Sequence, residues 1–324
     1  MSDLRPIRIE PLATEQHAFR RRFFWYPSAR SGFGALLDST ASTKRERVLL
    51  PAFIGWSHRE GSGVLDPVTS RGIPHSFYRM GADLRIDLTH LEELLQRHEV
   101  RLLVIIHFFG YVDPGYRSAV DLAQKHGAWV LEDEAHALYT DLIGGLSGSL
   151  GNAAVYSLHK MLPLPIGGML VLNGGSNEVR ELSPAGDPDK DVLWGYDLAR
   201  IAQQRVTNAL LLAELIGPLN GDVDLLWPKL EPGVVPQTLP VLVRSVPRDL
   251  LYEHMNNALG GVVTLYHTLV DGITLEEHPE SHALSRRIMN LPVHQDLGPA
   301  EIHAVASQLA ASVEALRDRG PHDR

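Results

Sequence analysis

Short apolar runs alternate with helical segments through the middle of the chain, an order typical of a parallel sheet wrapped by helices. The apolar runs predict strands at residues 101–110, 129–131, 153–157 and 167–173, and the periodic segments predict helices from about 89 to 98, 116–127 and 200–216. Thr89 and Glu92 have the spacing of a capping box, which predicts that the first of these helices begins at Thr89.

The pattern changes after Gly217, a residue expected just beyond the end of a helix. Four prolines at positions 218, 228, 232 and 236 interrupt the chain. A strand at 238–245, a helix at 248–261 and an amphipathic helix at 299–316 follow. We therefore predict an α/β protein with an N-terminal arm (1–25), a large domain (26–217) and a smaller C-terminal domain of mixed sheet and helices (218–324).

Composition and charge exclude several classes of protein. The 324 residues carry a net charge of −9 and no cysteine, which disfavours binding to nucleic acid phosphates and excludes disulfides and thiolate metal sites. The aromatic and arginine-rich stretch at 19–27 is better explained as part of an arm or interface than as a nucleic-acid or membrane patch. No apolar run is long enough for a membrane helix, and the first residues are charged where a secretory signal is apolar. A cytoplasmic protein that binds neither nucleic acid nor membrane is expected.

Two polar side chains follow predicted strands at the edge where ligands bind open parallel sheets. Asp133 follows the strand at 129–131, and Lys160 follows the strand at 153–157 within an apolar segment. Partial desolvation would lower the pKa of the lysine and make it a nucleophile toward an aldehyde, and a carboxylate could hold a pyridinium nitrogen. This pair suggests a pyridoxal 5'-phosphate site. A helix-capping aspartate and a surface lysine would explain either residue singly.

Four ordered motifs resemble the DegT/DnrJ/EryC1/StrS aminotransferases, a branch of the fold type I pyridoxal-phosphate enzymes. They are HFFGYV (107–112), VLEDEAHA (130–137), GSLGNAAVYSLHK with a following GG (148–160 and 167–168), and LPVHQDLGPAEI (291–302). The resemblance implies a fold type I transferase with a mostly parallel seven-stranded sheet in the large domain.

The resemblance also implies roles for individual residues. Lys160 would hold the cofactor as a Schiff base and move a proton between cofactor and substrate. Asp133 would pair with the pyridine nitrogen, His136 would lie beside the phenolic oxygen, and Ser157 would bind the phosphate. The turn SARSG (28–32) resembles a family turn whose backbone amides cradle that phosphate, which adds Ala29, Arg30 and Ser31 to the predicted cofactor-binding residues.

The aromatic residue expected to stack on the cofactor is harder to place. Within residues 49–57 we predict Trp56, with Phe53 as the alternative, because the family position falls between the two. The spacing between Ser157 and Lys160 is shorter than in many family members. Asp197 stands where the family has an asparagine that reaches the partner subunit's phosphate, and a carboxylate there would repel a phosphate. A divergent member of the family is therefore expected.

We predict an aminotransferase that moves an amino group from an amino acid to the keto group of a sugar or natural-product intermediate, and that acts as a homodimer. A lyase, dehydratase or epimerase with the same cofactor remains open. A regulatory protein on the same fold is a further alternative, and so is a metal-dependent hydrolase using Asp133, His136 and His107. No metal site is predicted. The identities of the donor and acceptor are left open.

Overall fold

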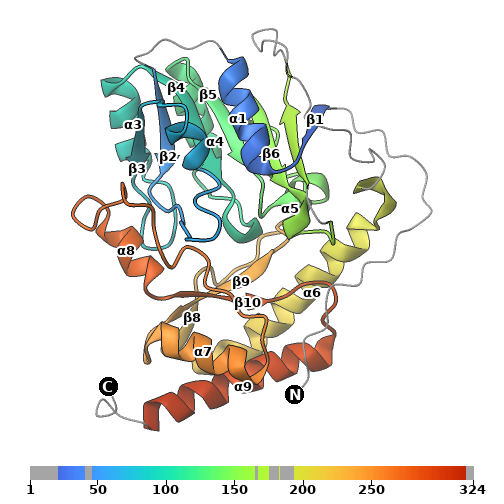
Figure 1. Ribbon diagram of the computed structural model, residues 1–324. Helices are drawn as coiled ribbons and strands as arrows, with labels where there is room; N and C mark the ends of the chain where they lie inside the picture. Colours follow the sequence, from blue (N-terminus) through green and yellow to red (C-terminus); the bar gives the residue numbers. More distant parts are fainter. Residues whose placement is uncertain (1–20, 41–45, 165–166, 175–181, 183–192, 319–324) are drawn as a thin grey trace.

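A seven-stranded sheet forms the larger part of the computed structural model, which describes residues 21–40, 46–164, 167–174, 182 and 193–318 (Figure 1). Its strand order is β1-β7-β6-β5-β4-β2-β3. The strands are β1 (Arg22–Tyr26), β2 (Arg47–Pro51), β3 (His75–Tyr78), β4 (Val100–Ile106), β5 (Trp129–Asp133), β6 (Ala153–Ser157) and β7 (Gly168–Leu172). Strands β2 to β6 pair in parallel, and β7 is antiparallel to both β6 and β1. The expected mixed α/β architecture with a mostly parallel sheet is confirmed.

Helices cover this sheet because its central strands are apolar on both faces, and residues 101–106 of β4 are all buried. The helices of this part are α1 (Ala29–Ser39), α2 (Asp66–Thr69), α3 (Leu88–Arg97), α4 (Tyr116–Lys125) and α5 (Leu138–Leu142), with short 3₁₀ turns η1 (Phe108–Gly110) and η2 (Leu158–Lys160). The strands from β2 to β6 run the same way, so their carboxyl ends lie at one edge of the sheet, where Asp133 and Ser157 are the last residues of β5 and β6.

A smaller antiparallel sheet lies below the first in Figure 1, in the order β10-β9-β8. Its strands are β8 (Val223–Leu225), β9 (Thr238–Val243) and β10 (Ile288–Pro292), and the accompanying elements are η3 (Leu193–Gly195), α6 (Leu198–Ile216), η4 (Gly217–Leu219), α7 (Arg248–Ala258), α8 (Pro279–Ser285) and α9 (Pro299–Asp318). The C-terminal half of α6 packs into the apolar cluster of this second sheet, through Ala209, Leu212 and Ile216. The division of the chain at residue 217 stays a prediction.

Several local expectations are wrong in detail. The helix α3 begins earlier than predicted: Asp87, not Thr89, is its N-cap and accepts from the amide of His90 at 3.0 Å. Gly217 directly follows the end of α6 at Ile216, as expected, but its φ of −50° is right-handed and the chain continues into a 3₁₀ turn. Residues 22–25, assigned to the arm, form most of edge strand β1, and residues 1–20 lie outside the described part of the chain. Within the described residues, no helix combines the length and apolarity needed to span a membrane.

Candidate active site

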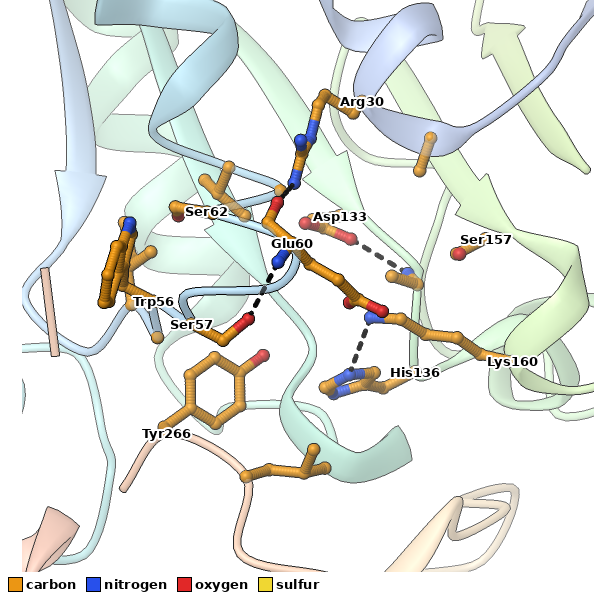
Figure 2. Close-up of a pocket in the computed structure, with 18 of the residues that line it drawn as sticks. Arg30, Trp56, Ser57, Glu60, Ser62, Asp133, His136, Ser157, Lys160 and Tyr266 are labelled. Carbon is orange, nitrogen blue, oxygen red and sulfur yellow. Dashed lines mark hydrogen bonds between the residues drawn. The ribbon is translucent and has the colours of Figure 1, made fainter. Parts of the chain in front are cut away.

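A cavity of about 590 Å³ lies at the carboxyl edge of the large sheet and is closed on one side by residues 264–268 from the C-terminal part of the chain. Small-molecule sites have volumes of a few hundred to about 1,000 Å³. Figure 2 shows Asp133, His136, Ser157 and Lys160 converging on this cavity. The structure thus brings together the four residues that the sequence places at the ends of two successive strands. Their functional roles stay predictions.

Asp133 lies at the base of the cavity as the last residue of β5, with only 9% of its surface exposed. One carboxylate oxygen, Oδ1, accepts from the Ala135 amide at 2.9 Å. Burial raises the pKa of Asp133, and the Ala135 amide and the positive charge of Lys160 oppose that rise. A buried carboxylate of this kind would be stabilised in its charged form by a cationic ligand atom, such as a protonated ring nitrogen.

His136 follows β5 and is oriented by the backbone of η1. Its Nδ1 accepts from the Phe109 amide at 3.3 Å, and its Nε2 lies 3.4 Å from Lys160 Nζ. Burial, followed by the nearby Lys160 charge, holds the pKa of His136 well below its usual value, so the ring is neutral. Because Nδ1 is an acceptor in this arrangement, the single proton belongs on Nε2, which faces the cavity.

Lys160 ends η2, directly after β6. Its side chain is exposed to the open cavity, and its amine lies near His136. Desolvation within the cavity lowers the pKa of Lys160, although the carboxylates of Asp133 and Glu60 partly oppose this. The neutral amine, which is the nucleophilic form, is favoured.

The other end of the cavity is formed by the start of α1 and the end of β6. The Ser28 side chain caps α1 by accepting from the Ser31 amide at 3.1 Å, and Ala29 and Arg30 begin the helix with backbone amides free of intrahelical partners. Ser28, Ala29, Arg30 and Ser157 all line the cavity, whereas the Ser31 side chain bonds back to Ser28. A helix N-terminus beside a serine hydroxyl is a favourable site for an anion.

Gly168 is what allows α1 to start so close to the sheet. It pairs with Ser157 on one side and with Tyr26 on the other. A Cβ atom at this position would lie 2.1 Å from the carbonyl carbon of Ser28 and 2.5 Å from the Ala29 nitrogen. The second glycine of the GG motif is therefore needed because β7 and the turn that precedes α1 are too close together there to admit a side chain.

The two aromatic residues predicted to stack on a cofactor differ in their surroundings. Trp56 lines the cavity, is 38% exposed and contacts the ring of His58 at 4.6 Å. Figure 2 draws it on the side away from Lys160. Phe53 is fully buried and is not part of the lining. Trp56 is thus the better placed of the pair, and its role stays a prediction.

Two cavity residues were not singled out from the sequence. Glu60 reaches toward Lys160 from a tight turn that begins at Ser57, whose hydroxyl accepts from the Glu60 amide at 3.1 Å (Figure 2). Arg30 donates to the carbonyl oxygen of Glu60 and lies 3.5 Å from Asp66. Tyr266 comes from the C-terminal part of the chain, and no motif or strand end marked it in the sequence.

A separate buried network lies behind Asp133. His107 Nε2 lies 3.1 Å from Glu132 and 3.4 Å from Glu134, and the ligand atoms of these three residues lie within 4.8 Å of one another. Glu132 also accepts from the Gly148 and Gly151 amides at 2.6 Å and from the Tyr116 hydroxyl. The metal-site alternative proposed His107 together with Asp133 and His136. Among the described residues, His107 instead pairs with the two glutamates, whose oxygens accept hydrogen bonds from the loop at 147–151.

Asp197 has a structural role within its own chain. It is the N-cap of α6, and its side chain accepts from the Arg200 amide at 2.9 Å. An aspartate is among the best residues for this position. An aspartate at position 197, in place of the asparagine found in the family, is thus compatible with folding of α6.

Comparison with known proteins agrees with this geometry. Residues 79–187 match the sequence model of the DegT/DnrJ/EryC1/StrS aminotransferase family. The matched segment is about a third of the chain. The predicted resemblance is therefore confirmed over the segment that carries Asp133, His136, Ser157 and Lys160.

One curated relative in this family region is the spore coat polysaccharide biosynthesis protein SpsC of Bacillus subtilis strain 168. It is 35% identical over 107 residues, which span 32% of this chain and 27% of the relative. The aligned segment thus covers little more than a quarter of SpsC.

Solved structures of similar aminotransferases match over most of the chain. Helicobacter pylori PseC, an aminotransferase involved in the biosynthesis of pseudoaminic acid, has a TM-score of 0.72 and 18% identity, with 91% of this chain and 87% of PseC covered. The putative sugar aminotransferase Spr1654 of Streptococcus pneumoniae, in its PLP form, has a TM-score of 0.71 and 14% identity, with 96% and 99% covered. At these identities the structures establish the fold alone, and the predicted fold type I architecture is confirmed.

The residues that line this cavity fit pyridoxal 5'-phosphate. The end of the cavity at the start of α1 has free helix amides beside Ser157, which suits a phosphate. The cavity also contains the buried carboxylate of Asp133, which suits a pyridinium, together with Lys160 and the Nε2 proton of His136. This donor set matches an anionic, aldehyde-bearing pyridine ring.

Proposed function

We propose that this protein is a pyridoxal-phosphate-dependent aminotransferase that transfers an amino group from an amino acid to the keto group of a small sugar or natural-product intermediate. The observation that carries the proposal is the 3.4 Å approach of the Lys160 amine to His136 in the cavity that Asp133 closes from below. Membership of residues 79–187 in the aminotransferase family supports the reaction class.

When bound, the cofactor would supply an aldehyde for imine formation and a ring that withdraws electrons from the substrate carbon. Ser157 and the amides of Ala29 and Arg30 would bind its phosphate. Asp133 would accept a hydrogen bond from the protonated ring nitrogen, and His136 Nε2 would donate one to the phenolic oxygen.

Lys160 would act twice, first as the nucleophile and then as a base. Its lowered pKa gives a neutral amine for the attack on the aldehyde. Once the amino donor has taken its place, the same amine would hold and move the proton of the substrate carbon that carries nitrogen. The neutral state of His136 avoids a second cation that would compete for Asp133.

The class of acceptor is supported by similar proteins. SpsC is named for polysaccharide biosynthesis, PseC for pseudoaminic acid biosynthesis, and Spr1654 as a putative sugar aminotransferase. We further propose a homodimer, because family active sites lie between subunits, and a cytoplasmic location. Mass measurement by light scattering tests the first, and a monomer at working concentration would contradict it.

The covalent step is tested by borohydride reduction of the purified protein with pyridoxal 5'-phosphate. We expect a stable cofactor adduct on the peptide that contains Lys160, and a visible absorption band that is absent in Lys160→Ala. Lys125→Ala is the matched control, because Lys125 is exposed and only pairs with Glu92. An unlabelled Lys160 peptide in the wild type would refute the cofactor assignment.

The reaction type needs a second measurement. An aminotransferase releases one keto acid for each amino acid consumed and loses its visible band until a ketone is added. A lyase or dehydratase regenerates the band without any ketone. Recovery of the spectrum only with keto acceptors, in the presence of a metal chelator, is the expected result and also excludes the metal-dependent hydrolase.

A further inference from the structure

Tyr266 occupies the space that a side chain at position 55 would need. The chain has glycine there, between Phe53 and Trp56, and a Cβ on Gly55 would lie 3.0 Å from the Tyr266 ring carbon Cδ1 and 3.3 Å from its Cα. An aromatic side chain at residue 55 and the tyrosine ring at 266 therefore exclude each other. The absence of a side chain at one position is matched by a large ring at the other.

The backbone holds Tyr266 in this place. The Trp56 amide donates to Thr268 O at 3.0 Å, and the Val270 amide donates to Ile54 O at 3.0 Å. These bonds join the segment 264–270 to the strand extension after β2. Tyr266 itself has φ +62°, a left-handed conformation that is uncommon for an aromatic residue and that persists at functional sites when the surroundings enforce it.

The ring of Tyr266 also packs against the residues that shape the cavity. Its centroid lies 5.2 Å from that of Phe53, 5.5 Å from Phe108 and 6.0 Å from His136. Burial, followed by the negative charge of Asp133, raises the pKa of the Tyr266 hydroxyl, so this group is a neutral donor near the aspartate. In Figure 2 the hydroxyl points into the cavity, whereas Trp56 lies farther from Lys160.

We propose that Tyr266, and not Trp56, supplies the aromatic surface against the cofactor ring, and that Gly55 is glycine to admit it. This inference rests on the proposed function, since it concerns how the same cavity would hold pyridoxal 5'-phosphate. The C-terminal part of the chain thereby contributes directly to the cofactor site. The aromatic contact with the cofactor ring comes from the segment after α7 and not from the segment after β2.

The test is the affinity of the apoprotein for pyridoxal 5'-phosphate, together with the visible circular dichroism of the bound cofactor. Tyr266→Gly removes the ring and tolerates the left-handed backbone, so folding is retained. We expect it to weaken binding about threefold to tenfold, the range for one aromatic contact, and to change the circular dichroism. Tyr266→Phe keeps the ring and should restore affinity to within about twofold of the wild type.

Steric exclusion gives a second, independent measurement. Gly55→Ala should weaken cofactor binding in the wild-type background and have a smaller effect when combined with Tyr266→Gly, because the shortest contact of the Cβ, with the tyrosine ring, is then removed. Equal effects of Gly55→Ala in both backgrounds would overturn the proposal.

Trp56→Ala tests the competing assignment. Loss of affinity in Trp56→Ala with full retention in Tyr266→Gly would overturn the role of Tyr266 while leaving the enzyme assignment intact. A wild-type protein that takes up no pyridoxal 5'-phosphate would overturn both, so the two failures are distinguishable.

Discussion

His136 Nε2 lies 3.4 Å from Lys160 Nζ, and the opposite nitrogen of the same ring accepts from a backbone amide. The imidazole is thus fixed in the tautomer that presents a hydrogen to the lysine. A hydrogen on Nε2 can bond to the lone pair of a neutral amine but repels an ammonium. The geometry and the lowered pKa of Lys160 therefore favour the same protonation state.

The pKa of Lys160 should respond to the two carboxylates that face it. Burial lowers this pKa, whereas Asp133 and Glu60 raise it. Asp133→Asn and Glu60→Gln should each lower it further, so the amine of the apoprotein reacts with an acylating reagent at lower pH than in the wild type. The rate at Lys160 is followed by peptide mass spectrometry across pH. Glu92→Gln, a change on α3 at a side chain that pairs with Lys125 and does not line the cavity, is the charge control, and an unchanged profile in both cavity variants would contradict the prediction.

Gly168→Ala should damage the phosphate end of the cavity. The added Cβ meets backbone atoms of Ser28 and Ala29, which cannot rotate away, so β7 or the start of α1 must move. We expect a loss of about 1–3 kcal/mol in the free energy of unfolding and weaker binding of pyridoxal 5'-phosphate and of inorganic phosphate. Urea denaturation and phosphate competition measure the two effects.

Gly217→Ala is the matched control for this substitution. A Cβ at position 217 meets no atom within 4 Å, and the backbone there is right-handed. Stability should be retained or slightly raised. If Gly168→Ala were equally harmless, the close contact between β7 and α1 could not be what makes the GG motif necessary.

The sequence predicted Asp133 and Lys160 because a polar residue at the end of a buried strand is a local feature. Helix ends were harder to predict. Thr89 and Asp87 are both residue types that cap helices, and only the structure shows that Asp87 caps α3. The orientation of His136 depends on the Phe109 amide, which a left-handed residue in η1 presents. Such a backbone conformation has no periodic pattern in the sequence.

Tyr266 could not be predicted for a different reason. Its place in the cavity results from tertiary contacts between the segment 264–270 and residues 54–56. Nothing in the sequence of either segment indicates that the two are in contact. Gly55 was the available signal, since it stood between the two aromatic residues considered. Without the fold, an absent side chain does not indicate which distant ring fills its space.

Glu134→Gln should stabilise the protein at neutral pH. Burial, followed by the charges of Glu132 and Asp141, raises the pKa of Glu134 well above its ordinary 4.5. Its Oε1 makes no hydrogen bond among the described residues, although it lies 3.4 Å from His107 Nε2, and Oε2 accepts from Ser147 at 2.9 Å. The folded state thus binds a proton that the unfolded state has released, and stability falls as pH rises above 4.5 toward the folded-state pKa.

The Glu134→Gln variant should lack this decline in stability, and its free energy of unfolding at neutral pH should be about 1–3 kcal/mol higher than that of the wild type. Urea denaturation between pH 5 and about pH 8, a range in which proteins are usually most stable, measures the slope. Glu132→Gln is the contrasting variant: burial would raise the pKa of Glu132, but the hydrogen bond from His107 and other donors lower it. Because Glu132→Gln removes this ionised acceptor, the free energy of unfolding of that variant should be lower than that of the wild type. Identical slopes for Glu134→Gln and the wild type would show that Glu134 is ionised in the folded protein.

Asp197→Ala should weaken the start of α6 without affecting the cofactor site. The side chain caps the Arg200 amide, and removal of such a cap costs about 1 kcal/mol, whereas Asp197→Asn should keep nearly all of it. Urea denaturation of the three proteins gives the stability order, and titration with pyridoxal 5'-phosphate gives the affinity. If Asp197→Asn instead tightened cofactor binding at unchanged stability, the aspartate would lie near a phosphate in the assembled protein and repel it. A stability change confined to the alanine variant, with equal affinities in all three, assigns the residue to folding and explains why a carboxylate is tolerated where the family has an amide.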